Sequence, residues 1–450
     1  MKNIEPFFNP KSVLIVGASR KPYTFSYTIL KNLLEIFYRG KLYILNPNAD
    51  EILGVKSYHT LAELPEVPEL AVIVFGKDLI TIFENLAIFG IKHIAIESEI
   101  RIDPTDIEVI EKLNQISKKN KVSYVGPSML GIINFYNNFT TSIIPVRQYL
   151  MQQHRKTKEG ISFIAQSGGL AGAMGWWKPS QNLSVSKVIH LGYGFDINDA
   201  DVLDYFKDDK TTKVIALFLR EITDRIVTST QNLAAIKPVL FFYVGIDEEK
   251  EEELVKAGGI AVMNYIELFE FAKILLWCPE PKGSAIGLIG PSSGAIELII
   301  KEMRKQNLSL AVLDKNQRKI IVDKVKGSTS ELGNPIDYWP PERLVGTTVC
   351  EIYNTSSKAL LKNDSVDGLI LALEFFNEIE FDFNIFKEIK KVYSDKPIIV
   401  ILIQAEYEGA KRVKKTATEL KIPIFENEVE RAIRGYKVLY EWHSKIKKIK

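Results

Sequence analysis

Short runs of apolar, largely β-branched residues alternate with longer amphipathic stretches along almost the whole chain. The runs are continuously apolar, as expected for strands that helices cover on both faces. The intervening stretches, such as Thr28–Phe37, are long enough for a crossover helix. In the first third the predicted strands are Ser12–Val16, Lys41–Leu45, Leu70–Val74, His93–Ile96 and Val122–Val125. This rhythm predicts an α/β fold built on doubly wound parallel sheets.

The same rhythm returns twice, which indicates three sheets in series. The later predicted strands are Ile161–Ile164, Lys187–His190, Val214–Leu219, Val239–Tyr243, Ile260–Val262, Ala285–Ile289, Leu308–Leu313, Gly368–Leu373 and Pro397–Leu402. A chain of 450 residues is too long for one compact core. The loop after Gly131 and the Pro/Gly-containing stretch Pro279–Gly283 are natural breaks. We therefore expect three domains, at 1–131, 132–280 and 281–450.

The composition favours a cytoplasmic protein without nucleic acid or membrane partners. The formal net charge is +2, and no apolar run approaches the roughly 20 residues of a membrane helix. Two cysteines, far apart in sequence, fit a reducing compartment better than a disulfide framework. The N-terminal residues lack the apolar core of a signal peptide. Abundant Lys, Glu and Ile with little Cys or Met suggests a hot habitat.

A glycine-bearing turn follows the first predicted strand and is a candidate phosphate site. Gly17, Ala18 and Ser19 are small enough for an anion to approach the backbone, and Arg20 and Lys21 add positive charge. The glycines of a G-x-G-x-x-G motif are absent. From these residues alone, a phosphate site and a plain tight turn both remain open.

The second predicted strand ends in Asn46-Pro47, where a dinucleotide enzyme would often place an Asp or Glu for the ribose. This makes NAD a poorer candidate and leaves room for another adenosine ligand.

A second turn gives the strongest anion nest in the sequence. Ser167, Gly168 and Gly169 stand between a strand and a small-residue helix expected to end near Trp176. A hydroxyl and free amides converge there at a helix N-terminus. The alternative is close packing of helix on strand through small residues. A third turn, Gly290–Gly294, has the same outline, but Pro291 removes one donor, so we interpret it as structural.

Other catalytic motifs are absent from the sequence. There is no G-x-x-x-x-G-K-[ST] loop, no His-x-x-x-His, no Cys-x-x-Cys and no Gly-x-Ser-x-Gly, so neither a metal site nor a P-loop ATP site is expected. The five histidines stand alone. His190, which closes a predicted strand near the second nest, is the one candidate for a functional role.

Taken in order, several motifs resemble a known family. They are Phe7–Val13 leading into Val16–Ser19, Asn46-Pro47 with Leu53–Lys56, Val125–Ile132, Gln166–Gly169, Asp201–Phe206 and Asn334–Asp337. Over essentially its whole length the chain resembles the α-subunit of NDP-forming acyl-CoA synthetases (acetate–CoA ligase, ADP-forming), relatives of succinyl-CoA synthetase.

The resemblance implies a Rossmann-like N-terminal CoA-binding domain followed by two flavodoxin-like, succinyl-CoA synthetase-like domains. Coenzyme A would contact Gly17, Ala18, Ser19, Arg20, Lys21, Asn46, Pro47, Gly126, Pro127 and Ser128, and phosphate would contact Ser167, Gly168 and Gly169. ATP or ADP would act only through a partner subunit. The expected partner is an ATP-grasp β-subunit, with a homo-oligomer as the alternative assembly. In the family a histidine carries the phosphoryl group from the nucleotide to the acyl group, which CoA then captures.

The chain departs from the family where that histidine is expected. After the strand that spans Val239–Tyr243, the family has a long glycine- and alanine-rich loop with a Ser-His-Thr-Gly-like motif. Here Gly245 leads directly into the acidic segment Ile246–Leu254, which contains no histidine. Its six carboxylates would repel phosphate, and its composition favours a solvated helix over a mobile loop.

A second departure concerns the glutamate that steadies the phosphohistidine in the family. Arg220 occupies the matching position and Glu221 is displaced by one residue, which on a strand would turn its side chain to the other face. Two family asparagines are also replaced, by Ser128 and Tyr193.

Two hypotheses follow. The first is a CoA- or acyl-CoA-binding homologue that has lost the phosphohistidine relay. The second is an active ligase subunit whose phosphoryl carrier has moved, to His190 or to a residue of the partner.

Overall fold

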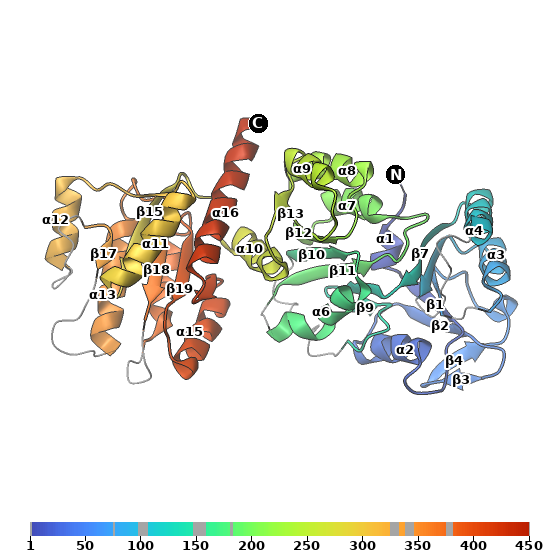
Figure 1. Cartoon of the computed structure of the whole chain (residues 1–450). Coiled ribbons are helices and arrows are strands. Elements are labelled where there is room, and N and C mark those ends of the chain that lie inside the picture. Colours follow the sequence, from blue (N-terminus) through green and yellow to red (C-terminus); the bar gives the residue numbers. More distant parts are fainter. Residues whose placement is uncertain are drawn as a thin grey trace. The chain divides into compact units, whose positions relative to one another are not determined.

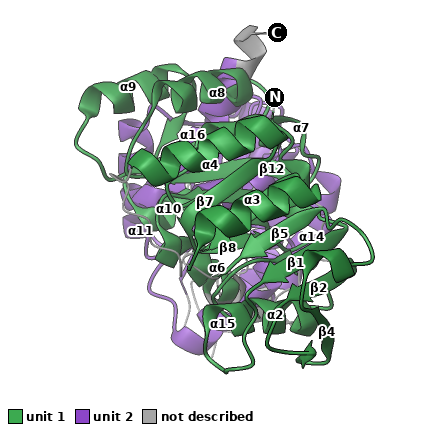
Figure 2. Ribbon diagram, turned by 90° about the vertical axis from the view of Figure 1, so that its right-hand side faces the viewer, with its two compact units in different colours: residues 1–268 green, residues 269–450 purple. Residues whose placement is uncertain are grey.

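The computed structural model describes residues 2–74, 77–97, 107–146, 159–180, 183–324, 333–337, 346–374 and 381–449 (Figure 1). The chain forms two compact units, residues 1–268 and 269–450 (Figure 2). The first unit contains two sheets and the second contains one. The finer division into three domains at the boundaries expected above stays a prediction.

The first sheet runs in the order β3-β4-β2-β1-β5-β6-β7. Its strands are β1 (Ser12–Val16), β2 (Lys41–Leu45), β3 (Glu51–Ile52), β4 (Val55–Tyr58), β5 (Leu70–Ile73), β6 (His93–Glu97) and β7 (Ser123–Met129), with helices α1 (Glu5–Phe8), α2 (Phe25–Glu35), η1 (Leu61–Glu63), α3 (Leu79–Phe89) and α4 (Ile107–Asn120). All neighbours are parallel except β3 and β4. Without β3, this is the Rossmann strand order, in which ligands bind beyond the carboxyl ends of the strands.

The second sheet runs in the order β14-β13-β12-β10-β11-β8-β9. Its strands are β8 (Gly131–Asn134), β9 (Phe139–Thr140), β10 (Gly160–Ala165), β11 (Val185–His190), β12 (Thr212–Leu219), β13 (Val239–Tyr243) and β14 (Ile260–Ala261), with helices α6 (Gly168–Ser180), α7 (Asp199–Asp208), α8 (Asp224–Ala234), α9 (Glu248–Lys256) and α10 (Tyr265–Trp277). Strands β10 to β14 are parallel in the flavodoxin order, and β8 joins their edge antiparallel to β11.

The third sheet, in the second unit, runs in the order β16-β15-β18-β19-β20, and β17 also pairs with β15. Its strands are β15 (Ala285–Gly290), β16 (Ser309–Leu310), β17 (Ile336–Asp337), β18 (Gly368–Leu373), β19 (Ile398–Leu402) and β20 (Ile424–Glu426), with helices α11 (Ser293–Lys305), α12 (Lys315–Lys324), α13 (Gly346–Leu361), η2 (Phe383–Ile385), α14 (Phe386–Val392), α15 (Tyr407–Glu419) and α16 (Val429–Ile449). The flavodoxin order therefore occurs twice, which confirms the predicted fold class.

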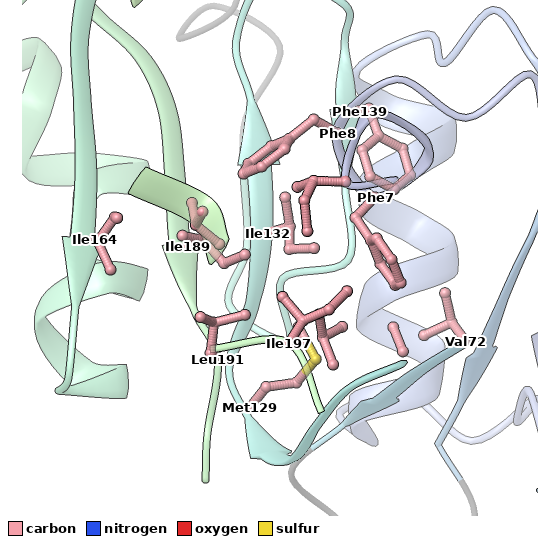
Figure 3. Packing of buried hydrophobic residues seen from close by; sticks show 14 of the residues in the cluster. Phe7, Phe8, Val72, Met129, Ile132, Phe139, Ile164, Ile189, Leu191 and Ile197 are labelled. Carbon is pink, nitrogen blue, oxygen red and sulfur yellow. The ribbon is translucent and has the colours of Figure 1, made fainter. Parts of the chain in front are cut away.

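The first two sheets share one apolar core, which explains why they form a single compact unit. Phe7 and Phe8 of α1 pack in this core with Met129 at the end of β7 and with Ile132 and Ile189 of the second sheet (Figure 3). All five residues are completely buried. The carboxyl end of β7 is therefore held rigidly against the second sheet.

Candidate functional site

The turn after β1 and the end of β2 are tied together. Gly17 has a φ of +85°, and its amide donates to the carbonyl of Leu45 at 3.1 Å. The Asn46 amide Nδ2 donates to the carbonyl of Ala18 at 2.8 Å, and Ala18 itself is buried. The structure thus brings together the residues predicted from these two separate segments.

The charged end of this turn faces solvent. Ser19 Oγ accepts from the amide of Lys21 at 3.0 Å, and the Arg20 guanidinium reaches the carbonyl of Asn48 at 3.4 Å. Arg20 and Lys21 are both exposed, as is Pro47 at the end of β2. Two cations are therefore available to an anionic ligand at the carboxyl edge of the first sheet, where the strand order reverses between β1 and β5.

The predicted contacts Gly126, Pro127 and Ser128 lie elsewhere on the same edge. They belong to β7, three strands from β1, which corresponds to about 14 Å. A side chain at Gly126 would collide with the carbonyl of Ile96 on β6. The Pro127 carbonyl accepts from the amide of Tyr193 at 3.2 Å, so this turn contacts the second sheet. The two groups of predicted cofactor residues can contact one ligand only if it extends across the strand ends.

The two glycines of the second nest have different roles. A side chain at Gly168 would collide with Leu130, which supports close packing at that position. In contrast, Gly169 is exposed, and among the described residues no atom apart from the adjoining helix backbone and chain neighbours would lie within 4 Å of a Cβ there. Ser167 precedes α6, which extends beyond the expected end near Trp176 to Ser180. One turn therefore combines a glycine required for packing, Gly168, with a glycine whose backbone is open to solvent, Gly169.

Gln166 joins the two strands that border the crevice of the second sheet. Its side-chain oxygen Oε1 accepts from the backbone amides of Arg220 at 2.6 Å and Glu221 at 2.9 Å, beyond the end of β12. Its amide donates to a carboxyl oxygen of Asp199 at 2.7 Å. Burial raises the pKa of Asp199, and the nearby Glu221 carboxylate acts in the same direction.

This geometry corrects one argument made from the sequence. Arg220 and Glu221 both follow β12, which ends at Leu219, so strand alternation does not set the directions of their side chains. The position of Glu221 beside Asp199 depends instead on the turn that Gln166 holds. Gln166 itself was part of a predicted motif but not of the predicted site, and its place directly before the Ser-Gly-Gly turn was the available signal.

His190 lies at the junction of the two sheets. Its Nδ1 accepts a hydrogen bond from the amide of Leu130 at 3.0 Å, which requires the ring to be unprotonated at that nitrogen. Burial lowers the pKa of His190 to about 4, so the imidazole is neutral at physiological pH. Since Leu130 also packs where Gly168 lacks a side chain, a single residue links the β7 end, His190 and the second nest.

Helix α9 (Glu248–Lys256) follows the carboxyl end of β13 after a short connection. β13 ends at Tyr243 and α9 begins at Glu248, with Asp247 as N-cap accepting from the amide of Lys250 at 3.0 Å. Acidic residues in the first turn stabilise a helix through its dipole. The expected solvated acidic helix is confirmed, and the short connection contains no histidine.

The remaining histidines in the described residues have ordinary contacts. His59 pairs with Asp50 at 2.9 Å, and His93 meets the carbonyl of Glu69 at 3.1 Å. His443 lies 3.6 Å from Glu280 in the second unit. His154 lies outside the described residues.

The described part of the chain contains neither a membrane-spanning helix nor a cluster of candidate metal ligands. No helix there is both long and apolar enough to cross a membrane. Within the same residues, no group of three or more His, Cys, Asp or Glu side chains is arranged to hold a metal ion.

Comparison with known proteins supports the resemblance seen in the motifs. Residues 11–134 match a CoA binding domain, and residues 158–275 match the succinyl-CoA ligase like flavodoxin domain. The α-subunit of ADP-forming acetate–CoA ligase II from Pyrococcus furiosus is 26% identical over 97% of this chain and 98% of its own. The chain is a relative of the ADP-forming acetate–CoA ligase α-subunits.

Longer relatives share only part of their length with it. Acetate–CoA ligase [ADP-forming] II of Archaeoglobus fulgidus is 28% identical over 94% of this chain, which spans 65% of that protein. The dinucleotide forming acetyl-coenzyme A synthetase 1 of Ca. Korarchaeum cryptofilum, solved with phosphate and ADP, has the same fold, with a TM-score of 0.86 at 22% identity over 99% of this chain and 98% of that one.

Proposed function

We propose that the chain binds CoA or acyl-CoA as a divergent α-subunit homologue of NDP-forming acyl-CoA synthetases and does not itself carry out a phosphohistidine relay. The observation that carries this proposal is the short connection between β13 and α9. A carrier that moves phosphate between separate pockets needs an imidazole on a long flexible arm. Here the strand leads within a few residues to a capped helix.

The first sheet supports the CoA part of the proposal. It carries the match to a CoA binding domain, and its first turn offers exposed Arg20 and Lys21 beside the open backbone of Gly17. The end of β2 has Asn46 rather than an acidic residue, which favours an adenosine ligand other than NAD.

The chemistry of α9 supports the loss of the relay. Asp247, Glu248, Glu249 and Glu252 are exposed on this helix. Carboxylates at this edge of the second sheet repel a phosphoryl group that approaches the nest at Ser167–Gly169. His190 offers no replacement carrier, because it is buried at a strand end and its Nδ1 is occupied by Leu130.

The alternative is an active ligase subunit that works with an ATP-grasp partner or within a homo-oligomer and converts acyl-CoA, ADP and phosphate into acid, CoA and ATP. The near-complete coverage of the Pyrococcus furiosus α-subunit favours it, as does Glu221 beside the Gln166 turn. In this alternative the nucleotide binds only to the partner.

Titration calorimetry with CoA and with NAD tests the ligand. We expect CoA to bind more tightly, and the double variant Arg20→Glu/Lys21→Glu to weaken CoA binding at least about tenfold, since two favourable charges become repulsive. The matched control is Lys31→Glu/Arg39→Glu, which changes the net charge equally at exposed positions away from the turn. Tighter binding of NAD, or equal losses in both variants, contradicts the ligand assignment.

Incubation with labelled ATP, Mg²⁺ and a cognate ATP-grasp partner tests the relay. We expect no acid-labile label on this chain. A label on any histidine that disappears on addition of a carboxylic acid substrate and CoA would establish the alternative.

A further inference from the structure

An exposed apolar patch lies at the carboxyl ends of β13 and β14. Ile246 is 99% exposed, Met263 is 68% exposed and Val244 is 48% exposed. The strand register places these residues together, because Phe241 pairs with Ala261 and both strands reach the patch within a few further residues. A single exposed apolar side chain is ordinary on a protein surface, but several neighbouring ones mark a candidate contact surface.

Ile246 has no packing role in its own turn. The residue before a helix N-cap often packs against the fourth helical residue. Here Asp247 is the N-cap of α9 and the fourth residue is Glu251, so this apolar contact cannot form. The turn itself is held in place, because the amide of Asp247 donates to Tyr243 Oη at 3.2 Å. The protein therefore presents an isoleucine to solvent on an ordered turn.

Negative charge borders this patch. The exposed residues Asp247–Glu249 follow Ile246 directly, and within the described residues none of their carboxylates forms an ion pair. The next residue, Lys250, does not neutralise them, because its ammonium group pairs with Asp224 at 2.7 Å and with Glu253 at 2.6 Å. A surface that fits this patch must therefore combine an apolar pocket with positive charge.

A cavity of about 330 Å³ in the first unit has this combination. It lies at the amino ends of β1 and β2, and the charged residues in its lining are Lys11 and Arg39. Both are exposed, and in the described part of the chain neither side chain is in an ion pair. The apolar wall includes Tyr38 and the buried Phe139, whose rings lie 5.7 Å apart, and three asparagines complete the lining. The Glu69 carboxylate accepts from the backbone amide of Lys11 at 2.6 Å, so the two cationic side chains outnumber it.

We propose that a second copy of the chain is the partner, with Ile246 of one copy seated in the cavity at Lys11 and Arg39 of the other. An isoleucine that is 99% exposed does not occupy the cavity of its own copy, and both surfaces belong to one compact unit, so the contact forms between copies. The carboxylates of Asp247–Glu249 then face the two cations, and an arrangement with two-fold symmetry makes the contact twice. The inference does not depend on CoA binding.

Light scattering over a series of protein concentrations measures the association. We expect a dimer whose dissociation constant rises at least about tenfold in Ile246→Ser, which removes the apolar contact, and in Arg39→Glu, which reverses a charge. Adding Glu248→Lys and Glu249→Lys to Arg39→Glu should recover most of this loss, which a merely structural role of Arg39 would not allow. The control Ile88→Ser changes an isoleucine of α3 that is 67% exposed and should leave the dimer intact.

A chain that stays monomeric throughout the series, or a dimer that Ile246→Ser leaves unchanged, would overturn the inference. So would a monomer that needs Ile246 to bind an ATP-grasp partner, because another protein is then the occupant of this surface. The variant Lys31→Glu/Arg39→Glu separates this inference from the proposed CoA binding, since it should be monomeric and still bind CoA. If it remains dimeric, the inference fails while the CoA assignment stands.

Discussion

The second and third sheets have the same strand order but different chemistry at the same position. In both, the strand order reverses beside a central strand, β10 or β15, whose turn leads into a helix. After β10 the turn offers Ser167 and an open Gly169. After β15, Ser292 uses its hydroxyl to cap α11, accepting from the amide of Ala295 at 3.4 Å. The shared topology fixes where a ligand would bind, while the residues around the turn decide whether one can.

Further contacts at the third turn favour a structural role over anion binding. β17 pairs with β15 so that Asp337 lies opposite Gly290, at the end of the strand. Burial raises the pKa of Asp337, and the Glu297 carboxylate acts in the same direction. Asn334 fills the space beside β15, bonding to Leu288 and to the neighbouring backbone. The interpretation of this turn as structural, made from Pro291 alone, stays a prediction that these contacts favour.

The largest expected effect follows from removing Asn334. Its Oδ1 accepts from the amide of Leu288 at 3.0 Å, and its Nδ2 donates to the carbonyls of Ile286 and Ala311 at 3.0 and 2.9 Å. Asn334→Ala removes three buried hydrogen bonds and should lower the stability of the second unit by about 4 kcal/mol. Hydrogen exchange of peptides from β15 measures this effect locally.

Gln166 is the counterpart of Asn334 in the second sheet, and its removal should lower stability by less. Gln166 makes its bonds at a partly exposed edge, where water can replace them, so Gln166→Ala should cost about 1 kcal/mol, measured in peptides from β10. The exposed Asn384→Ala serves as a control with little expected effect. Equal losses of stability in Asn334→Ala and Gln166→Ala would contradict the proposed difference between the crevice beside β15, which Asn334 fills, and the open crevice beside β10.

Much of the fold could be predicted because most strands are continuous apolar runs. The strands at Ser12–Val16, Lys41–Leu45, Val239–Tyr243 and Gly368–Leu373 match their predicted bounds. The predicted strand Leu308–Leu313 is shorter, at Ser309–Leu310. The pairs β3/β4 and β8/β9 and the strands β17 and β20 were missed, because their residues become strands through pairing rather than through their own pattern.

The candidate site could be predicted only in pieces. The sequence located each turn, since glycine and serine after an apolar run are local signals. It could not show that Asn46 bonds to the first turn while Gly126 lies three strands away, because strand order is set by tertiary packing.

A pH titration tests whether His190 holds the junction of the second sheet as a neutral ring. The folded pKa of about 4 lies below the ordinary value of 6.5, so the unfolded chain binds a proton that the folded chain does not between these two values. Stability should be complete above pH 6.5 and fall by about 3 kcal/mol as the pH decreases to 4. In His190→Asn, which keeps an acceptor for the Leu130 amide, this contribution should vanish.

Urea unfolding at several pH values gives the stability of the unmodified protein and of His190→Asn as two curves against pH. Burial also lowers the pKa of His93, which contributes in the same direction to both proteins, so the difference between the curves isolates His190. The exposed His59→Asn should follow the unmodified protein. If His190→Asn retains the full pH dependence, the ring is not the neutral acceptor that the geometry requires.

The smallest expected effect compares one glycine from each of the two sheets. Gly169 and Gly294 both lie in the first turn of a helix, and among the described residues no atom apart from the adjoining helix backbone and chain neighbours would lie within 4 Å of a Cβ at either. Alanine at either position should therefore stabilise its helix by about 0.5–1 kcal/mol. If the nest after β10 binds phosphate, the new methyl group in Gly169→Ala obstructs the approach of the anion and weakens inorganic phosphate binding about tenfold, whereas Gly294→Ala leaves it unchanged. Phosphate binding followed by calorimetry or by chemical shifts of the α6 amides distinguishes the two variants. Equal behaviour of both would mean that the second turn, like the third, only packs a helix against its strand.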